Sequence, residues 1–165
     1  MTPPCKIRFM VPTDRPRIAD TWVHSHRASA LGRSMRAADY TRRMDRAIRA
    51  ILERTGVGCI FVAHPPDDED AIMGWACVER VPPATTILHY VWVSGIWRRC
   101  GVGRRLLHAI AREDFPRVAV SHLTDRGARI VAASSATRQL VGCDGAPYVR
   151  FNDLLALAPD AEVAT

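Results

Sequence analysis

The sequence is poor in lysine and contains no long hydrophobic run. Lys6 is the only lysine among 23 basic residues, so arginine carries almost all of the positive charge. No apolar segment approaches the ~20 residues that a membrane-spanning helix needs, which excludes a membrane span. The formal net charge is +6. A basic surface of this kind favours an anionic ligand, either a nucleotide cofactor or a nucleic acid.

The five cysteines are odd in number and scattered, and their spacing fits neither a zinc site nor a disulfide framework. We therefore expect free thiols, which are typical of a reducing cytoplasm. The first residues lack the apolar core of a signal peptide, which also favours a cytoplasmic location. The acidic run DDED at 67–70 is expected to be a solvated turn, and no metal site is predicted.

The length of 165 residues is sufficient for one domain with its own core, and we expect a single domain over 1–165. Strand-like and helix-like segments alternate, which predicts a mixed α/β chain. The part after residue 124 has a weaker pattern, and its elements are left open. The expected elements are strands at 6–11, 58–63, 71–81, 85–93 and 117–124, a helix that starts near Pro16 and reaches Ala30, a helix that Asp39 caps and Gly56 ends, and a helix at 101–115.

The segment IWRRCGVGRRLL, residues 96–107, joins a strong β run to an amphipathic helix. The first amides of a helix lack intrahelical partners and carry the positive end of its dipole. Glycines at 101 and 103 allow a phosphate to approach these amides, and the neighbouring arginines add charge-assisted contacts. The loop lacks the Gly-Lys-Ser/Thr of a Walker A motif and the third glycine of a dinucleotide fingerprint. It therefore predicts a pyrophosphate site of another kind.

The segment YVWVSGIWRRCGVGRRLLHAI, residues 90–110, resembles the central motif of the GNAT superfamily of acyl-CoA N-acyltransferases. Arg98, Gly101 and Gly103 match its Arg/Gln-x-x-Gly-x-Gly/Ala signature, and Trp97 stands at the usual aromatic position. The order of elements over roughly 6–124 is also similar to that of the family. Three further segments resemble small acetyltransferase-like proteins of bacteriophages, which would place the protein in the host cytoplasm.

This resemblance implies an α/β (α+β) fold: a mixed, mostly antiparallel central sheet with helices on both faces and a splay between the fourth and fifth strands. It implies acetyl-CoA as co-substrate, with its pantetheine arm in the splay and no metal. An amine acceptor would attack the thioester directly in a ternary complex, without an acyl-enzyme. The residues that the resemblance assigns to acetyl-CoA are Val91, Val93, Arg98, Arg99, Cys100, Gly101, Val102, Gly103 and Arg104.

Two catalytic groups that are common in the family are missing. Ile87 occupies the position of the usual glutamate base on the fourth strand, and Leu140 and Val141 are nearest to the usual tyrosine acid. His89 is expected to replace the glutamate, because strict alternation places it on the same face as Ile87, Val91 and Val93. His122, at the end of the fifth strand, is the second catalytic candidate. For His89, a structural role in a half-buried sheet is an alternative of equal weight, and for His122 the structural role is the preferred interpretation.

The candidate substrate contacts lie on three elements. His26 lies late in the first helix, although a solvated helix end is the preferred interpretation of that residue. Trp75 and Glu79 alternate on the third strand, where Glu79 is more readily explained as an exposed strand carboxylate. Thr124 lies beside His122 on the same face of the fifth strand.

Two functions outside this leading interpretation remain open. One is a non-catalytic CoA-binding or partner-binding accessory protein of a phage. The other is a nucleic-acid-binding protein that uses arginine and aromatic side chains. The sequence leaves both the acceptor amine and the choice between monomer and homodimer open.

Overall fold

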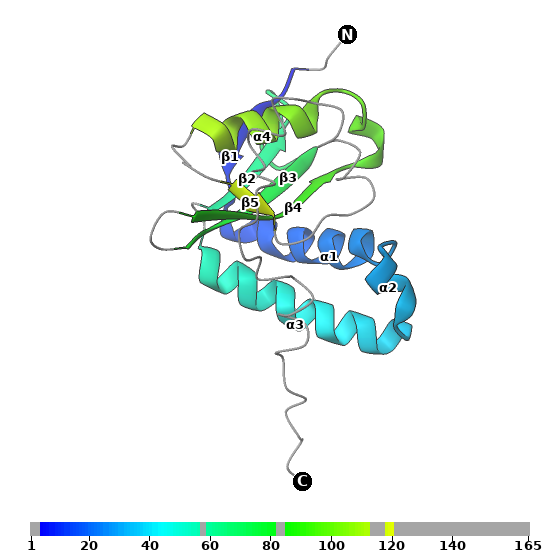
Figure 1. Cartoon of the computed structure of the whole chain (residues 1–165). Coiled ribbons are helices and arrows are strands. Elements are labelled where there is room, and N and C mark those ends of the chain that lie inside the picture. Colours follow the sequence, from blue (N-terminus) through cyan, green and yellow to red (C-terminus); the bar gives the residue numbers. More distant parts are fainter. Residues whose placement is uncertain (1–3, 57–58, 82–84, 113–117, 121–165) are drawn as a thin grey trace.

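The computed structural model describes residues 4–56, 59–81, 85–112 and 118–120. Its centre is a five-stranded sheet in which the strands follow the order of the chain (Figure 1). The first four strands are antiparallel to one another, and the fifth is parallel to the fourth. The strands are β1 (Lys6–Phe9), β2 (Ile60–His64), β3 (Gly74–Val81), β4 (Thr85–Val93) and β5 (Val118–Val120).

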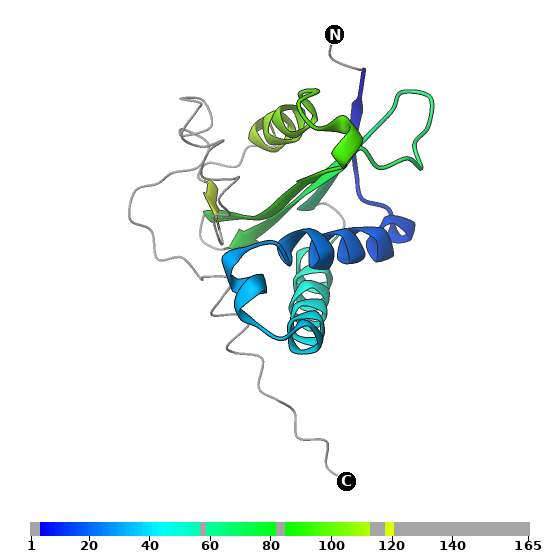
Figure 2. The same ribbon diagram turned by 90° about the vertical axis from the view of Figure 1, so that its right-hand side faces the viewer.

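Helices cover both faces of the sheet, as Figures 1 and 2 show. One face carries α1 (Arg15–His26), α2 (Ala30–Ser34) and α3 (Ala37–Thr55), and the other carries α4 (Val102–Arg112). Two 3₁₀ turns, η1 (Pro12–Asp14) and η3 (Gly95–Trp97), precede α1 and α4. This arrangement confirms the predicted mixed, mostly antiparallel sheet between two helical layers.

The alternation of side chains along β3 divides the buried residues into two clusters. Trp75 and Cys77 pack with α1 and α3, whereas Ala76 and Val78 pack with α4. Strand β3 therefore has apolar residues at every position from Gly74 to Val78, which is typical of a strand covered on both faces.

The strict alternation predicted for β4 is interrupted by a β-bulge. Cys77 pairs with Tyr90 while Val78 pairs with Leu88, so His89 is an extra residue on β4. As a result Leu88, and not His89, shares the α4 face with Val91 and Val93. The expectation that His89 faces the same side as Val91 and Val93 is therefore wrong, because one inserted residue reverses the alternation.

The helix boundaries also differ from those predicted. The first helix ends at His26, and Ser29 caps a separate short helix by accepting a hydrogen bond from the Gly32 amide at 3.1 Å. Ala30 therefore belongs to α2 instead of the first helix. The next helix starts before Asp39, which pairs with Arg42 in its first turn at 3.0 Å and does not cap it.

The pairing between β4 and β5 covers only the first part of β4. It runs from Thr86 opposite Val118 to Leu88 opposite Val120. Beyond Leu88, β4 continues to Val93 without a partner strand on that edge among the described residues. We call this part of β4, from His89 to Val93, its open edge.

None of the helices in the described part of the chain combines the length and the apolar character that crossing a membrane requires.

Candidate functional site

The connection from β4 to α4 has an unusual backbone. Arg99 has φ of 64° and Gly101 has φ of 78°, both in the left-handed region, and α4 starts immediately afterwards at Val102. A left-handed conformation costs free energy for a residue with a side chain, so Arg99 is held there by its surroundings. The first α-helical bond runs from the Arg105 amide to the Gly101 carbonyl at 3.0 Å. The amides of the residues just before it have no intrahelical acceptor, and we call this turn, residues 99–104, the cradle.

The side chains around this cradle are basic, and residues 85–112 contain no acidic residue. Arg98 donates to the Val93 carbonyl at 3.3 Å and ties the loop to the end of β4. Arg105 donates to the Cys5 carbonyl at 3.0 Å, which ties α4 to the start of β1. Arg104 donates to Nε2 of His108 at 3.5 Å, one turn further along α4. All four arginines are exposed, so their guanidinium groups also face solvent.

Gly103 lies at the point where α4 rests on β4. A Cβ atom at this position would lie 3.6 Å from Cγ2 of Val93, which is an ordinary contact distance. Any longer side chain at Gly103 would enter the space beside the end of β4. Gly74, opposite Val93 on β3, has even less room, because its Cβ would lie 2.7 Å from the Trp92 carbonyl oxygen. An isolated glycine in a strand was the signal that could have identified this close approach.

A second polar cluster lies on the α3 face of the sheet and contains Arg54, Glu79 and His89. Arg54 binds the Glu79 carboxylate through Nε at 2.6 Å and Nη2 at 3.0 Å. Nε2 of His89 contacts Oε2 of Glu79 at 2.7 Å, and the imidazole is only 2% exposed. These hydrogen bonds from His89 and Arg54 lower the pKa of Glu79 to about 2.

The preferred interpretation of Glu79 as an exposed strand carboxylate is therefore wrong, because its side chain is only 15% exposed and has two partners. Sequence analysis missed Arg54 entirely. It lies 25 residues before Glu79, and no local pattern links the two.

The end of α1 is buried against β4 and α3. His26 is 2% exposed, and its Nδ1 lies 3.0 Å from the hydroxyl of Tyr40. Ser25 reaches the Tyr90 hydroxyl at 3.1 Å. The preferred interpretation of His26 as a solvated helix end is wrong, because α3 and β4 cover this turn. Burial lowers the pKa of His26 to about 4, so its imidazole is neutral at neutral pH.

Protein stability is expected to fall as the pH decreases from 6.5 to 4. In this window the unfolded chain binds a proton at His26 that the folded chain, with its lowered pKa of about 4, does not bind. A shift of this size corresponds to about 3 kcal/mol. His26→Gln should flatten the dependence of the unfolding free energy on pH in this window, measured by urea denaturation. An equal slope in the variant would contradict the assignment.

Trp75 is fully buried, and its indole Nε1 donates to Thr21 at 3.0 Å. It stacks in an aromatic cluster with Trp22, Tyr90 and Trp92. This burial argues against direct contact between Trp75 and a substrate. His122 and Thr124 lie outside the described residues.

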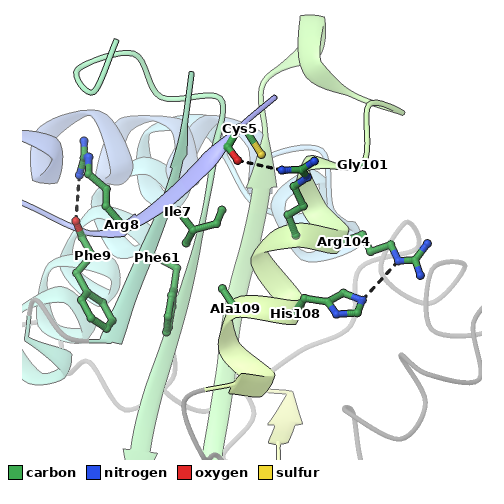
Figure 3. Close-up of a pocket in the computed structure, with 10 residues that line it drawn as sticks. Cys5, Ile7, Arg8, Phe9, Phe61, Gly101, Arg104, His108 and Ala109 are labelled. Carbon is green, nitrogen blue, oxygen red and sulfur yellow. Dashed lines mark hydrogen bonds between the residues drawn. The ribbon is translucent and has the colours of Figure 1, made fainter. Parts of the chain in front are cut away.

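A groove of about 810 Å³ lies between β1, β2 and α4 (Figure 3). Ile7, Phe9 and Phe61 form its apolar wall, and Gly101 and Arg104 of the cradle border it. The groove is on the α4 side of the sheet, whereas Glu79 and His89 meet at α3. It therefore does not include the second polar cluster.

No group of three or more acidic, histidine or cysteine side chains suited to a metal ion occurs among the residues that the structure describes.

The five-stranded sheet between two helical layers and the left-handed turn before α4 agree with the family that sequence comparison identifies. A family model described as the acetyltransferase (GNAT) family matches residues 20–129, which is more than half of the chain. The chain therefore belongs to the GNAT family of acetyltransferases.

Solved structures with the same fold come from several organisms. A protein from Corynebacterium glutamicum, described as "histone acetyltransferase HPA2 and related acetyltransferase", has a TM-score of 0.60 at 21% identity and covers 81% of this chain and 83% of its own. A ribosomal-protein-alanine N-acetyltransferase from Brucella melitensis has a TM-score of 0.54 at 12% identity, covering 88% and 98%. An N-acetyltransferase from Staphylococcus aureus has a TM-score of 0.54 at 11% identity, covering 80% and 88%. At these identities the similarity shows the fold alone.

In sequence, the chain matches none of the curated proteins.

Proposed function

We propose that this acetyltransferase transfers an acetyl group from acetyl-CoA to an amine by direct attack in a ternary complex. The observation that carries the proposal is the backbone between β4 and α4, where left-handed Arg99 and Gly101 precede a helix of 11 residues. An arginine held in the left-handed region beside unpaired amides fits a pyrophosphate better than it fits a purely structural turn. The free thiols of the four described cysteines support a reducing, cytoplasmic location.

Acetyl-CoA supplies the activated acetyl group, and the chain supplies the groups that hold it. The amides of residues 101–104 and the guanidinium groups of Arg99 and Arg104 bind the phosphates. Val102 contributes its amide to the same cradle, whereas the Cys100 amide donates to the Trp97 carbonyl at 3.4 Å and supports the turn. Arg98 fixes the position of the cradle through the Val93 carbonyl. The open edge of β4 at Val91 and Val93 holds the pantetheine arm and donates an amide hydrogen to the thioester oxygen.

His89 is the proposed general base, with His122 as the second candidate. The acceptor nitrogen forms the new amide bond and the C–S bond breaks, and the second proton of that nitrogen passes to the leaving thiolate, which departs as the CoA thiol. The imidazole of His89 accepts the proton that the acceptor ammonium group must lose before it attacks. Because His89 is only 2% exposed, this transfer passes through an intervening water. Orientation of the two reactants supplies much of the remaining rate enhancement.

Acetyl-CoA is expected to bind in the micromolar range, with an affinity that decreases as the salt concentration rises. The reason is that the ligand's phosphates meet arginines and amides in a segment without any acidic residue. Isothermal titration at several salt concentrations measures both effects. Desulfo-CoA, which keeps the phosphates, should show the same salt dependence.

Turnover with a library of amines tests the function itself and identifies the acceptor among antibiotics, polyamines, nucleobase amines, peptide N-termini and protein lysines. Acetylation of any of these amines supports the proposal. Tight, salt-dependent binding of an oligonucleotide without binding of acetyl-CoA would instead favour the nucleic-acid alternative.

A further inference from the structure

The cluster of Arg54, Glu79 and His89 includes the first residue of the open edge of β4, which is His89. We propose that Glu79 is a positioning residue that holds the His89 imidazole in the orientation and tautomer required for accepting the acceptor's proton. This inference rests on the proposed function.

The hydrogen bonds around Glu79 leave its carboxylate little freedom. Arg54 binds Oε1 through Nε at 2.6 Å and Oε2 through Nη2 at 3.0 Å, in a bidentate arrangement. This pair fixes the plane of the carboxylate, because two parallel hydrogen bonds resist rotation of the group. Oε2 then faces Nε2 of His89 at 2.7 Å. The chain of contacts therefore runs from α3 through β3 to β4.

The contact with Glu79 determines which nitrogen of His89 is basic. A carboxylate only accepts hydrogen bonds, so Nε2 of His89 must carry a proton to make this contact. In the neutral imidazole the lone pair is then on Nδ1, which is the atom that accepts the acceptor's proton. The resulting imidazolium lies beside the Glu79 carboxylate, which stabilises its positive charge. The proton later returns to water, so the imidazole is unchanged over one cycle.

The sheet register places this carboxylate beside the position where the family's usual base is missing. Glu79 on β3 is directly opposite Ile87 on β4. Cross-strand neighbours on the same face lie close together, so Glu79 brings a carboxylate to this face from the adjacent strand. His89 follows Ile87 by two residues, so alternation places the imidazole on this face as well. In this chain, a carboxylate and an imidazole together occupy the region where the resemblance expects a single glutamate.

Among the described residues, three ionisable groups lie near the imidazole or its partner: Glu79 and Cys77 on β3, and Arg54 on α3. Burial raises the pKa of the Cys77 thiol, so this group stays neutral and contributes no charge. The two charged neighbours therefore act in opposite directions. The negative charge of Glu79 attracts positive charge on the neighbouring ring, and Arg54 reduces that attraction by neutralising Glu79.

Opposite shifts of the pH–rate profile test the proposal. A base must be deprotonated to act, so kcat/KM rises with pH as the base loses its proton. Glu79→Gln removes the negative charge and should move this rising limb to lower pH, with a loss of about 10-fold in kcat and unchanged affinity for acetyl-CoA. Arg54→Gln leaves the carboxylate uncompensated and should move the limb to higher pH. A merely structural role would lower the rate without moving the limb in opposite directions.

A matched control is Asp45→Asn, which breaks an exposed arginine–carboxylate pair on the same helix, where Asp45 binds Arg49 at 2.8 Å. This variant should keep the wild-type pH–rate profile.

A readout without substrate is the ¹⁵N NMR spectrum of the histidine rings in the ligand-free protein. The His89 ring should show the tautomer protonated at Nε2 in the wild type, and a mixture of tautomers in Glu79→Gln.

Wild-type pH profiles and an unchanged His89 tautomer in Glu79→Gln would overturn the positioning role while leaving the proposed function intact. Failure of the wild type to bind acetyl-CoA or to acetylate any amine would overturn the proposed function. It would also overturn the proposed role of Glu79 and His89 in proton transfer. If Glu79→Gln does not fold, Arg54→Gln decides: a shift of the limb to higher pH supports the proposal, and no shift overturns it.

Discussion

Gly103→Glu is expected to abolish acetyl-CoA binding, with a loss of at least about 100-fold in affinity, while the protein remains folded. The backbone tolerates a Cβ atom at this position, because it would lie 3.6 Å from Cγ2 of Val93. The rest of the glutamate side chain would enter the space beside the end of β4 and place a negative charge against the ligand's phosphates. Isothermal titration measures the affinity, and thermal denaturation checks the fold.

Gly95→Glu is the matched control for the added charge. It lies in the same connection between β4 and α4, and a Cβ atom there meets nothing within 4 Å. This variant should bind acetyl-CoA with nearly the wild-type affinity. Gly101→Glu should also abolish binding, but φ of 78° at Gly101 adds backbone strain, so Gly103→Glu is the cleaner test. Unchanged affinity in folded Gly103→Glu would contradict the assignment of the cofactor site.

His89→Ala is expected to lower turnover of the acceptor by ~10²-fold or more while leaving acetyl-CoA affinity nearly unchanged. The imidazole is the only ionisable group on β4 between Thr85 and Val93 apart from the Tyr90 phenol. Its loss removes the proposed base but none of the groups proposed to hold the phosphates. In the variant, the rising limb of the pH–rate profile should disappear. Steady-state kinetics over pH 5–9 would measure both effects.

His122→Ala tests the other candidate base in the same assay. A loss of turnover in His122→Ala with none in His89→Ala would exchange the two roles. If neither variant loses activity, the acceptor amine loses its proton to solvent, and the buried contact between His89 and Glu79 serves the fold alone.

Local patterns were sufficient to predict most of the secondary structure. The branched and aromatic residues of 85–93 predicted β4 with its observed bounds, and the apolar spacing of Val102, Leu106 and Ile110 predicted the face that α4 buries. The glycines at 101 and 103 located the start of α4, because a left-handed residue and a close contact with β4 are needed there. These features depend on a few neighbouring residues, so a single sequence contains the necessary information.

Features that depend on distant residues could not be predicted in this way. The bulge at His89 results from the pairing of two whole strands, and nothing in TILHYVWV marks the inserted residue. The burial of His26 depends on Tyr40 and Tyr90, which lie 14 and 64 positions further along the chain. The contact between Arg54 and Glu79 likewise appears only after α3 has packed on the sheet.

The inserted residue at His89 determines how β4 can change in evolution. Deletion of His89 would remove the bulge, and Leu88 and Tyr90 could keep their pairs with Val78 and Cys77. Tyr90 and Trp92 would then stay on the α1 face and Val91 and Val93 on the α4 face, because regular alternation from Leu88 places them there. Related chains are therefore expected either to carry the extra residue or to lack it, with the residues that follow it on unchanged faces.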